Sequence, residues 1–156
     1  MNFRFAEEKD LPIIQKLVLE LARYEKMEDQ VTATIEDYRK SLFEEKIAEV
    51  LFVEEGDSIR GMALFFHNYS TFLGKKGLYL EDLYIRKTHR KKGYGKALFL
   101  ELIRIAHERN CGRMEWVCLD WNTPGHQFYR KLKANPLEQW VIYRLKEQQI
   151  LEWTKE

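Results

Sequence analysis

Three strand-like segments follow one another in the middle of this chain, and they limit its fold more than any other feature. Residues 48–54 and 59–68 are rich in apolar and aromatic side chains, and the turn signal Glu55-Gly56-Asp57 separates them. We therefore expect a β-hairpin there. A third segment, 78–86, follows a loop at 69–77 and has the leucine, aromatic and β-branched side chains of a further strand.

Helix-like segments stand on both sides of these strands. Apolar residues recur at helical spacing from Leu11 to Leu21, and we expect Asp10 to cap that helix and Thr34 to cap the next. The order of elements predicts a mixed α/β fold, in which helices cover a central sheet, as a single domain of residues 1–156. The full set of expected elements is strands at 2–6, 48–54, 59–68, 78–86, 114–119 and 140–145, helices at 11–23, 34–44, 97–109 and 123–133, and a helical turn at 147–155.

The composition argues against several classes of protein. The chain has 156 residues, of which 45% are hydrophobic and 33% charged, and its formal net charge is +1. A nucleic-acid-binding protein is normally strongly basic, so we expect no nucleic-acid partner. No apolar run approaches the roughly 20 residues that span a membrane, and the first residues lack the apolar segment of a signal peptide.

The cysteines and histidines give no sign of a metal site. Cys111 and Cys118 have the spacing of neither a redox pair nor a zinc framework, and the four histidines lie at no metal-ligand spacing. Two free thiols are typical of a reducing compartment. We therefore expect a cytoplasmic protein that uses no metal and has no membrane partner.

The strongest local signal is a basic turn with two glycines, between a predicted strand and a predicted helix. It reads Arg90-Lys91-Lys92-Gly93-Tyr94-Gly95-Lys96. Glycine lets the backbone approach a ligand closely, and the first N–H groups of a helix have no partner within the helix. Such a helix start, with basic side chains around it, is suited to a pyrophosphate. The P-loop and the three-glycine dinucleotide motif are absent, and a solvated basic loop is the alternative interpretation.

Four motifs give the chain a family resemblance. Arg90-x-x-Gly93-x-Gly95, after a strand and at the start of a helix, resembles the acetyl-coenzyme A signature of the GNAT superfamily. The other three motifs are ELARYEKMEDQV at 20–31, YLED at 79–82 and WNTPGHQFY at 121–129. Together they resemble the spermidine/spermine (diamine) N-acetyltransferase branch over nearly the whole chain.

The resemblance implies both a fold and an activity. The implied GNAT fold is a central, mostly antiparallel, twisted sheet flanked by helices. The implied enzyme transfers an acetyl group from acetyl-coenzyme A to a primary amine of a small cationic substrate, such as spermidine or spermine, by direct attack. The family is commonly dimeric, so we expect a homodimer. One departure is Lys133, since the family usually has glycine soon after the tyrosine of the last motif.

The coenzyme contacts are expected in three parts of the chain. Backbone groups of Leu83, Tyr84 and Ile85 are expected to pair with the pantetheine arm as a neighbouring strand would. Asn122 is implied to bind the same arm, and it can also cap the helix that follows it. The pyrophosphate contacts are expected from the turn, namely from Arg90, Lys91, Lys92, Gly93, Tyr94, Gly95 and Lys96.

Acetyl transfer to an amine needs a proton acceptor and a proton donor. An alkylammonium has a pKa of about 10.4, so at neutral pH it lacks the lone pair that attacks a thioester. Glu81 is the candidate base, acting through water. Asp82 ranks below it because neighbouring strand side chains face opposite ways, unless a bulge intervenes. Tyr129 is the candidate acid, since the resemblance places this tyrosine beside the thioester sulfur.

Acidic residues would steer and hold a cationic substrate. The expected substrate-binding residues are Tyr24, Glu25, Glu81, Asp82 and Glu138. Lys75 and Lys76, in the loop before the YLED strand, would disfavour a long polycation, so a lysine-like or thialysine-type amine is the alternative substrate. A non-catalytic sensor of acyl-coenzyme A is a further alternative, although a sensor needs neither a base nor an acid.

Overall fold

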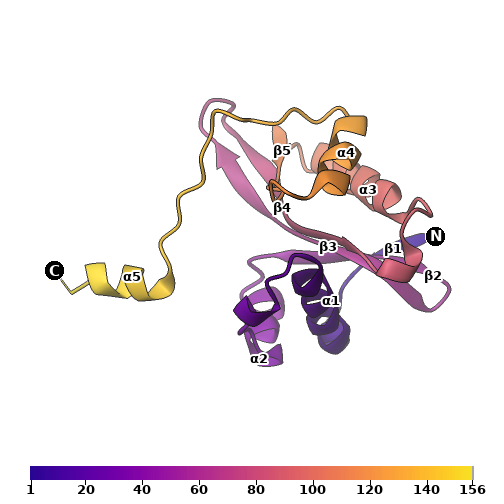
Figure 1. Ribbon diagram of the computed structural model, residues 1–156, viewed down its shortest axis with the longest axis horizontal. Helices are drawn as coiled ribbons and strands as arrows, with labels where there is room; N and C mark the ends of the chain where they lie inside the picture. Colours follow the sequence, from indigo (N-terminus) through magenta and orange to yellow (C-terminus); the bar gives the residue numbers. More distant parts are fainter. Residues whose placement is uncertain (156) are drawn as a thin grey trace. The chain divides into compact units, whose positions relative to one another are not determined.

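The computed structural model describes residues 1–155, which divide into two compact units, with the second unit beginning at Cys118. The first unit contains a five-stranded sheet in the order β1-β2-β3-β4-β5 (Figure 1). All neighbouring strands are antiparallel except β4 and β5, which are parallel. The mixed α/β fold with a mostly antiparallel sheet is confirmed. The strands are β1 (Asn2–Phe5), β2 (Glu49–Glu55), β3 (Ser58–Ser70), β4 (Lys75–Ile85) and β5 (Arg113–Glu115).

Helices cover both faces of this sheet (Figure 1). On one face lie α1 (Leu11–Tyr24) and α2 (Ile35–Tyr38), the latter continued by a π-helical turn, Arg39–Glu44. On the other face lies α3 (Tyr94–Glu108). Because successive strand side chains point to opposite faces, a sheet covered on both sides buries consecutive residues, as in the run from Val50 to Val53 of β2.

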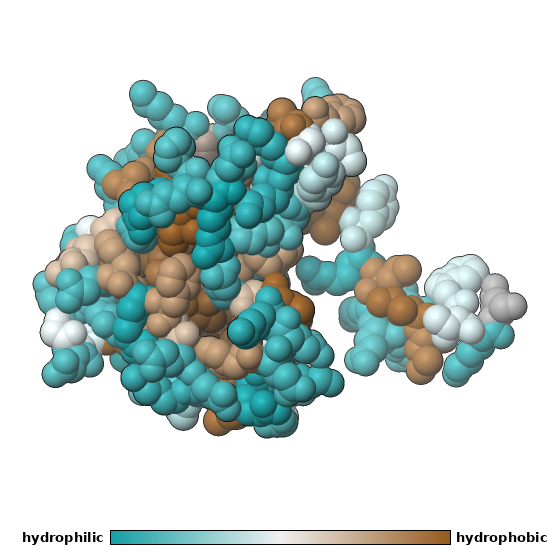
Figure 2. All heavy atoms as spheres, turned by 180° about the vertical axis from the view of Figure 1, so that it is seen from behind, coloured by the Kyte–Doolittle hydropathy of each residue, from teal (hydrophilic) through white to brown (hydrophobic). Residues whose placement is uncertain are grey.

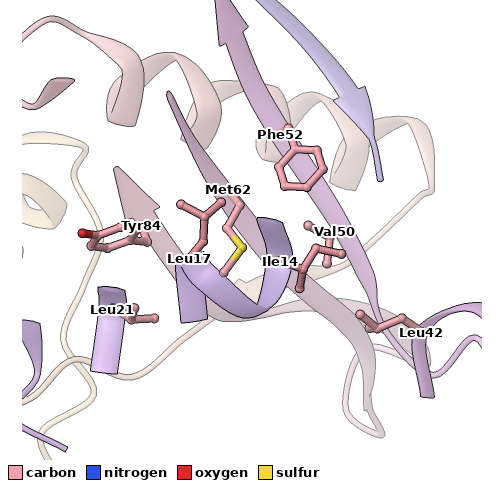
Figure 3. Close-up of a cluster of buried hydrophobic side chains, with 8 residues drawn as sticks. All are labelled: Ile14, Leu17, Leu21, Leu42, Val50, Phe52, Met62 and Tyr84. Carbon is pink, nitrogen blue, oxygen red and sulfur yellow. The ribbon is translucent and has the colours of Figure 1, made fainter. Parts of the chain in front are cut away.

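The core beneath α1 joins the N-terminal helices to the strands that carry the candidate site. Tyr84 of β4 is the residue of this cluster nearest in sequence to the basic turn, and only 6% of its surface is exposed. Figure 3 shows how side chains of α1 interdigitate with those of the sheet. The eight buried members are Ile14, Leu17, Leu21, Leu42, Val50, Phe52, Met62 and Tyr84.

The two predicted helix caps have different outcomes. Thr34 caps α2 as expected, because its hydroxyl accepts a hydrogen bond from the N–H of Asp37 at 3.2 Å. Asp10 stands at the N-cap position of α1, as expected, but its side chain makes no capping hydrogen bond. Its carboxylate accepts two hydrogen bonds from Arg4 of β1, at 2.7 and 2.9 Å, and a third from the N–H of Glu7 at 2.8 Å. These partners use the carboxylate that would otherwise have capped α1.

The loop predicted at 69–77 is mostly strand. β3 continues to Ser70 and β4 begins at Lys75, so only four residues make the turn. Gly74 supplies that turn with a left-handed φ of 59°. Gly77 lies inside β4 opposite Asn68, where an added Cβ would lie 2.3 Å from the Asn68 side-chain oxygen. Glycine at this point permits close strand pairing instead of a loop.

The second unit contains two helices, α4 (Thr123–Lys131) and α5 (Glu147–Trp153), at the positions expected from the sequence. The strand predicted at 140–145 does not form within the described residues 118–155. A strand needs a neighbouring strand to pair its backbone groups, and none forms within this unit. The strand predicted at 114–119 is likewise reduced to the three residues of β5.

Candidate functional site

A β-bulge interrupts the pairing of β3 and β4. Leu64 lies opposite Asp82, whereas the next residue, Phe65, lies opposite Leu80, so Glu81 has no partner on β3. A bulge inserts one residue, bends its strand and re-aims a side chain. Strict alternation therefore does not hold at Glu81 and Asp82, and the sequence-based reason for ranking Asp82 below Glu81 is removed.

Three carboxylates influence one another at this bulge. Burial raises the pKa of Asp82, and the negative charges of Glu81 and Glu25 raise it further, to about 7. Burial also raises the pKa of Glu25, and the charge of Glu81 adds to that effect. Mutual repulsion of this kind requires short separations. The structure therefore brings together Glu25, Glu81 and Asp82, three of the expected substrate-binding residues.

Tyr38, the last residue of α2, is a neighbour of these carboxylates that the sequence did not reveal. It is partly buried against the cluster beneath α1. Burial raises the pKa of its phenol, and the charge of Asp82 contributes next. In the sequence Tyr38 looked like any aromatic residue of an amphipathic helix, and only the packing of α2 shows which strand residues it approaches.

An unpaired strand edge follows the bulge. β5 pairs with β4 only from Gly77 to Tyr79, so among residues 1–155 no strand pairs with residues 80–85 on that side. An unpaired edge presents N–H and C=O groups that can bond an extended ligand. The sequence predicted such pairing for residues 83–85.

The hydrogen-bond phase of β4 shows which backbone groups reach that edge. The N–H of Arg86 donates to the carbonyl of Arg60 on the β3 side at 3.0 Å. Antiparallel strands bond at alternate residues, and the register from 82 to 85 is unbroken. The backbone of Tyr84 therefore bonds to β3, while the backbones of Leu83 and Ile85 point to the open edge. The backbone groups of Leu83 and Ile85, two of the three residues expected to pair with the coenzyme arm, therefore point toward the open edge.

The basic turn exposes a row of backbone N–H groups. Lys91 and Gly93 have left-handed φ values of 62° and 87°, and α3 begins directly afterwards at Tyr94. No hydrogen bond among the described residues uses the N–H groups of residues 91–96. Lys91, Lys92 and Lys96 are exposed around them. The turn thus combines N–H donors, the positive end of a helix and three ammonium groups, which suits a pyrophosphate.

Two side chains of the turn point back into the first unit. The phenol of Tyr94, 6% exposed, donates a hydrogen bond to the carboxylate of Glu55. The guanidinium of Arg90 lies over the rings of Tyr24, at 4.5 Å, and Tyr84, at 5.4 Å. Tyr94 can therefore offer a coenzyme only its backbone, and Arg90 connects the turn with the end of α1.

Lys75 and Lys76 lie at the far end of β4 from the bulge. Lys76 precedes Asp82 by six residues, and a strand rises about 3.3 Å per residue, so roughly 20 Å of strand separates them. Their position in a strand weakens the sequence-based argument that these lysines exclude a polycation.

Three further expected site residues belong to the second unit. Asn122 caps α4, because its side-chain oxygen accepts a hydrogen bond from the N–H of Gly125 at 3.1 Å. Tyr129 lies on the same helix, with its ring centroid 5.3 Å from that of Phe128. Glu138 is an exposed residue between α4 and α5. The carboxylates at the bulge and the basic turn belong to the first unit.

Lys133, two residues after α4 ends, has a left-handed φ of 61°. This conformation favours glycine because a Cβ crowds the neighbouring carbonyl. A left-handed conformation at this position would explain why glycine is usual there in the family that the chain resembles. This chain places a lysine in that conformation.

Among residues 1–155, no group of three or more His, Cys, Asp or Glu side chains is arranged to hold a metal ion. No helix there is long and apolar enough to cross a membrane.

A mixed sheet with an open strand edge and a glycine turn before α3 is the arrangement expected of a coenzyme-dependent acyltransferase. Residues 14–133 match the model of the Acetyltransferase (GNAT) family, and the chain belongs to this family. It is an acetyl-coenzyme A-dependent amine N-acetyltransferase.

Several known proteins are similar to the chain. A thialysine N-epsilon-acetyltransferase from Bos taurus is 33% identical over 153 residues, covering 90% of this chain and 89% of the relative. An L-ornithine N5-acetyltransferase from Arabidopsis thaliana is 39% identical over 87 residues, 56% of this chain but only 38% of the relative. A human spermidine/spermine N(1)-acetyltransferase-like protein is 30% identical, covering 97% of this chain and 23% of the relative.

A solved structure agrees with the fold. An integron cassette protein from V. cholerae superposes with a TM-score of 0.83, at 23% identity, over 99% of this chain and 98% of that protein. At this identity the likeness concerns the fold alone.

Proposed function

We propose that this enzyme acetylates a primary amine of a small cationic substrate, a polyamine or diamine such as spermidine or spermine. The observation that carries this proposal is the cluster of three carboxylates formed by Glu25, Glu81 and Asp82. Burial, and after it the charges of neighbouring carboxylates, raises the pKa of Asp82 and of Glu25, so a bound ammonium would offset an existing electrostatic cost. Negative residues also steer a polycation toward the site.

The coenzyme would bind along the open edge of β4 and at the start of α3. For an extended arm Leu83 supplies its N–H and C=O, and Ile85 supplies its N–H, because Arg90 already bonds the carbonyl of Ile85. The N–H groups of residues 91–96 supply donors for a pyrophosphate. Acetyl-coenzyme A brings the activated acyl group. The chain's part is to hold the thioester and the amine together, which can lower the barrier by several kcal/mol.

The proton leaves the ammonium through Glu81 or Asp82, by way of water. Both lie at the bulge, and neither is excluded by strand alternation. A carboxylate with a pKa of about 7, as Asp82 has, is closer to the working pH and therefore a better base than an ordinary one. Once deprotonated, the amine nitrogen forms a bond to the thioester carbon, and the carbon–sulfur bond breaks.

Tyr129 then protonates the departing thiolate. This role rests on the WNTPGHQFY motif and on the placement of Tyr129 on a regular helix that Asn122 caps. By the same motif Asn122 holds the pantetheine arm. Tyr24 and Glu138 complete the substrate contacts in this proposal.

A lysine-like amine is the second candidate substrate. The similarity to a thialysine acetyltransferase over 90% of this chain favours it. Such a substrate carries one ammonium to be acetylated and an α-amino acid group, so it needs fewer carboxylates than spermidine does. Either substrate carries an ammonium that Glu25, Glu81 and Asp82 would attract.

A homodimer in the cytoplasm completes the proposal. Five of the six residues 140–145 are apolar or aromatic, but the segment has no strand partner within the described residues 118–155. Trp140 and Tyr143 are 79% and 92% exposed. Figure 2 shows apolar side chains, in brown, on the C-terminal part of the chain that includes α5. Exposed apolar patches of this kind mark protein interfaces, and a second copy would supply a strand partner. Sedimentation of the purified chain tests this.

The activity is tested by following thiol release from acetyl-coenzyme A with spermidine, spermine, putrescine, lysine, thialysine, an aminoglycoside and a lysine peptide. A preference for spermidine or spermine supports the proposal, and a preference for thialysine selects the second candidate. Coenzyme binding without turnover on any amine contradicts both.

Two variants test the proposed chemistry. Tyr129→Phe removes the proton donor, and Glu81→Gln removes one proton acceptor. General acid–base catalysis contributes about 10²–10⁴-fold, so each should reduce kcat by at least tenfold. Asp57→Asn, in the exposed turn between β2 and β3, is the control. If both site variants keep wild-type turnover, the mechanism is wrong.

A further inference from the structure

Arg90 makes side-chain contacts that a residue serving only to bind phosphate would not need. Its Nε donates a hydrogen bond to the carbonyl of Ile85 at 3.0 Å. Its guanidinium carbon lies 4.5 Å from the ring centroid of Tyr24 and 5.4 Å from that of Tyr84. Both distances are within the roughly 6 Å at which a cation is attracted to a ring face. The side chain therefore already has partners within the first unit.

These contacts join three parts of the candidate site. Tyr24 ends α1 and directly precedes Glu25, one of the three clustered carboxylates. Ile85 ends β4, at the open edge expected to hold the coenzyme arm. Arg90 itself begins the basic turn. One side chain thus contacts the amine side and the coenzyme side of the site together.

A second link ties α1 to the end of β4. Arg86 forms an ion pair with Glu20 of α1 at 3.1 Å, and both side chains are partly buried. That pair holds the middle of the helix near the strand, but it lies more than a turn of helix before Tyr24. Tyr24 packs at the edge of the buried cluster, and Arg90 adds the contact that links Tyr24, and the Glu25 that follows it, to the basic turn.

We propose that Arg90 is a positioning residue for the amine, which holds Tyr24 and thereby Glu25 against the bulge of β4, and is not primarily a phosphate ligand. This inference rests on the proposed function. Loss of the planar guanidinium leaves the N–H groups of the turn in place and frees the end of α1. The amine site then loosens, while the pyrophosphate keeps its backbone donors.

Arg90→Lys is the central variant, because lysine keeps the charge but cannot stack on a ring and donate to Ile85 in the same geometry. Coenzyme A affinity is measured by calorimetry. The affinity of the coenzyme A-saturated protein for spermidine and for thialysine is measured in the same way, along with KM and kcat. Arg104→Lys, on an exposed face of α3, is the matched control.

We expect Arg90→Lys to change the dissociation constant of coenzyme A by less than about threefold. The dissociation constant and KM of the amine should rise between about threefold and thirtyfold, with a smaller change in kcat. A coenzyme A affinity that falls tenfold with amine affinity unchanged identifies a phosphate ligand and overturns the proposal. Equal losses of both affinities together with a lower Tm identify a purely structural residue, which also overturns it.

A double-mutant cycle provides the second test. Tyr24→Leu removes the ring and should weaken amine binding as Arg90→Lys does, and the double variant should be little worse than either single one. Additive losses contradict the coupling. A wild-type protein that binds an amine but does not turn it over contradicts the proposed function alone, because the binding cycle still reports on Arg90.

Discussion

Asp82 and Glu81 lie side by side at a bulge of β4, and the charge of Glu81 adds to burial in raising the pKa of Asp82 to about 7. Between its ordinary pKa of 3.8 and about 7, Asp82 holds a proton in the folded protein that the unfolded chain has released. The folded state therefore binds more protons in this range, and the stability contributed by Asp82 falls as pH rises toward 7.

Asp82→Asn should consequently stabilise the protein near neutral pH, because asparagine carries no charge to bury. The gain over wild type should grow from pH 4.5 to pH 8 and reach about 1 to 3 kcal/mol. This range is discounted from about 1.4 kcal/mol per pKa unit because Asp82 is only partly buried. Urea unfolding at both pH values measures it, with Asp57→Asn as the control. A gain that does not depend on pH would show that Asp82 is not protonated in the folded state.

The same titration should govern amine binding. As pH rises through about 7, Asp82 becomes charged and the three carboxylates attract a cation more strongly, so kcat/KM for spermidine should rise over this range. In Asp82→Asn this inflection should disappear and KM should be higher at pH 8. The measurement is kcat/KM from pH 6 to pH 8.5. An unchanged inflection in the variant would assign it to another group.

Substitutions in the glycine turn can distinguish an effect on folding stability from an effect on coenzyme binding. A Cβ added at Gly95 would meet only the Cγ1 of Ile85, at an ordinary 3.5 Å, and alanine has a higher helix propensity than glycine. Gly95→Ala should therefore keep or raise Tm. Its methyl group would stand beside the N–H groups proposed to hold the pyrophosphate, so the dissociation constant of coenzyme A should rise about tenfold or more.

Gly93→Ala is the contrasting variant, because φ at Gly93 is 87° and a Cβ there is strained whether or not a ligand binds. It should lower Tm as well as coenzyme affinity, at a cost of about 1 kcal/mol or more. If Gly95→Ala binds coenzyme A as tightly as wild type, the pyrophosphate does not approach the start of α3.

The sequence predicted the parts of this molecule that local patterns determine. The hairpin at Gly56, the helix with Leu17 on its buried face and the turn at Gly93 all depend on neighbouring residues in the chain, and all three formed where expected. Asp10 failed as a cap because Arg4, on another element, takes its carboxylate. Arg4 is only six residues away, but it lies on a strand, and the pattern of the helix gives no sign of this contact.

The candidate site likewise has residues that the sequence predicts and contacts that only the three-dimensional structure shows. Arg90 was visible as part of a basic turn, but its packing on Tyr24 depends on how α1 meets β4. The bulge that brings Glu81 and Asp82 into one group is a property of the β3–β4 register, and the sequence could only name it as a possibility. Tyr38 joins them through the packing of α2. The sequence shows which residue types are present, but it does not show which of them contact one another in the folded protein.

Lys133 provides a prediction in the second unit that needs no substrate. Its φ of 61° lies in the left-handed region, which costs a residue with a Cβ roughly 1–2 kcal/mol and glycine much less. Glycine loses more chain entropy on folding, by about 0.5–1 kcal/mol. Lys133→Gly should therefore stabilise the end of α4 by about 1 kcal/mol, seen as a higher unfolding midpoint in urea.

Lys131→Gly is the control for this substitution, because Lys131 is the last residue of α4 and has no positive φ. The same lysine-to-glycine change should there cost up to about 1 kcal/mol, since glycine is a poor helix former. Opposite signs for two variants only two residues apart would show that backbone conformation, and not loss of a lysine side chain, causes the effect. A destabilised Lys133→Gly protein would mean that the side chain of Lys133 contributes more stability than its backbone conformation costs.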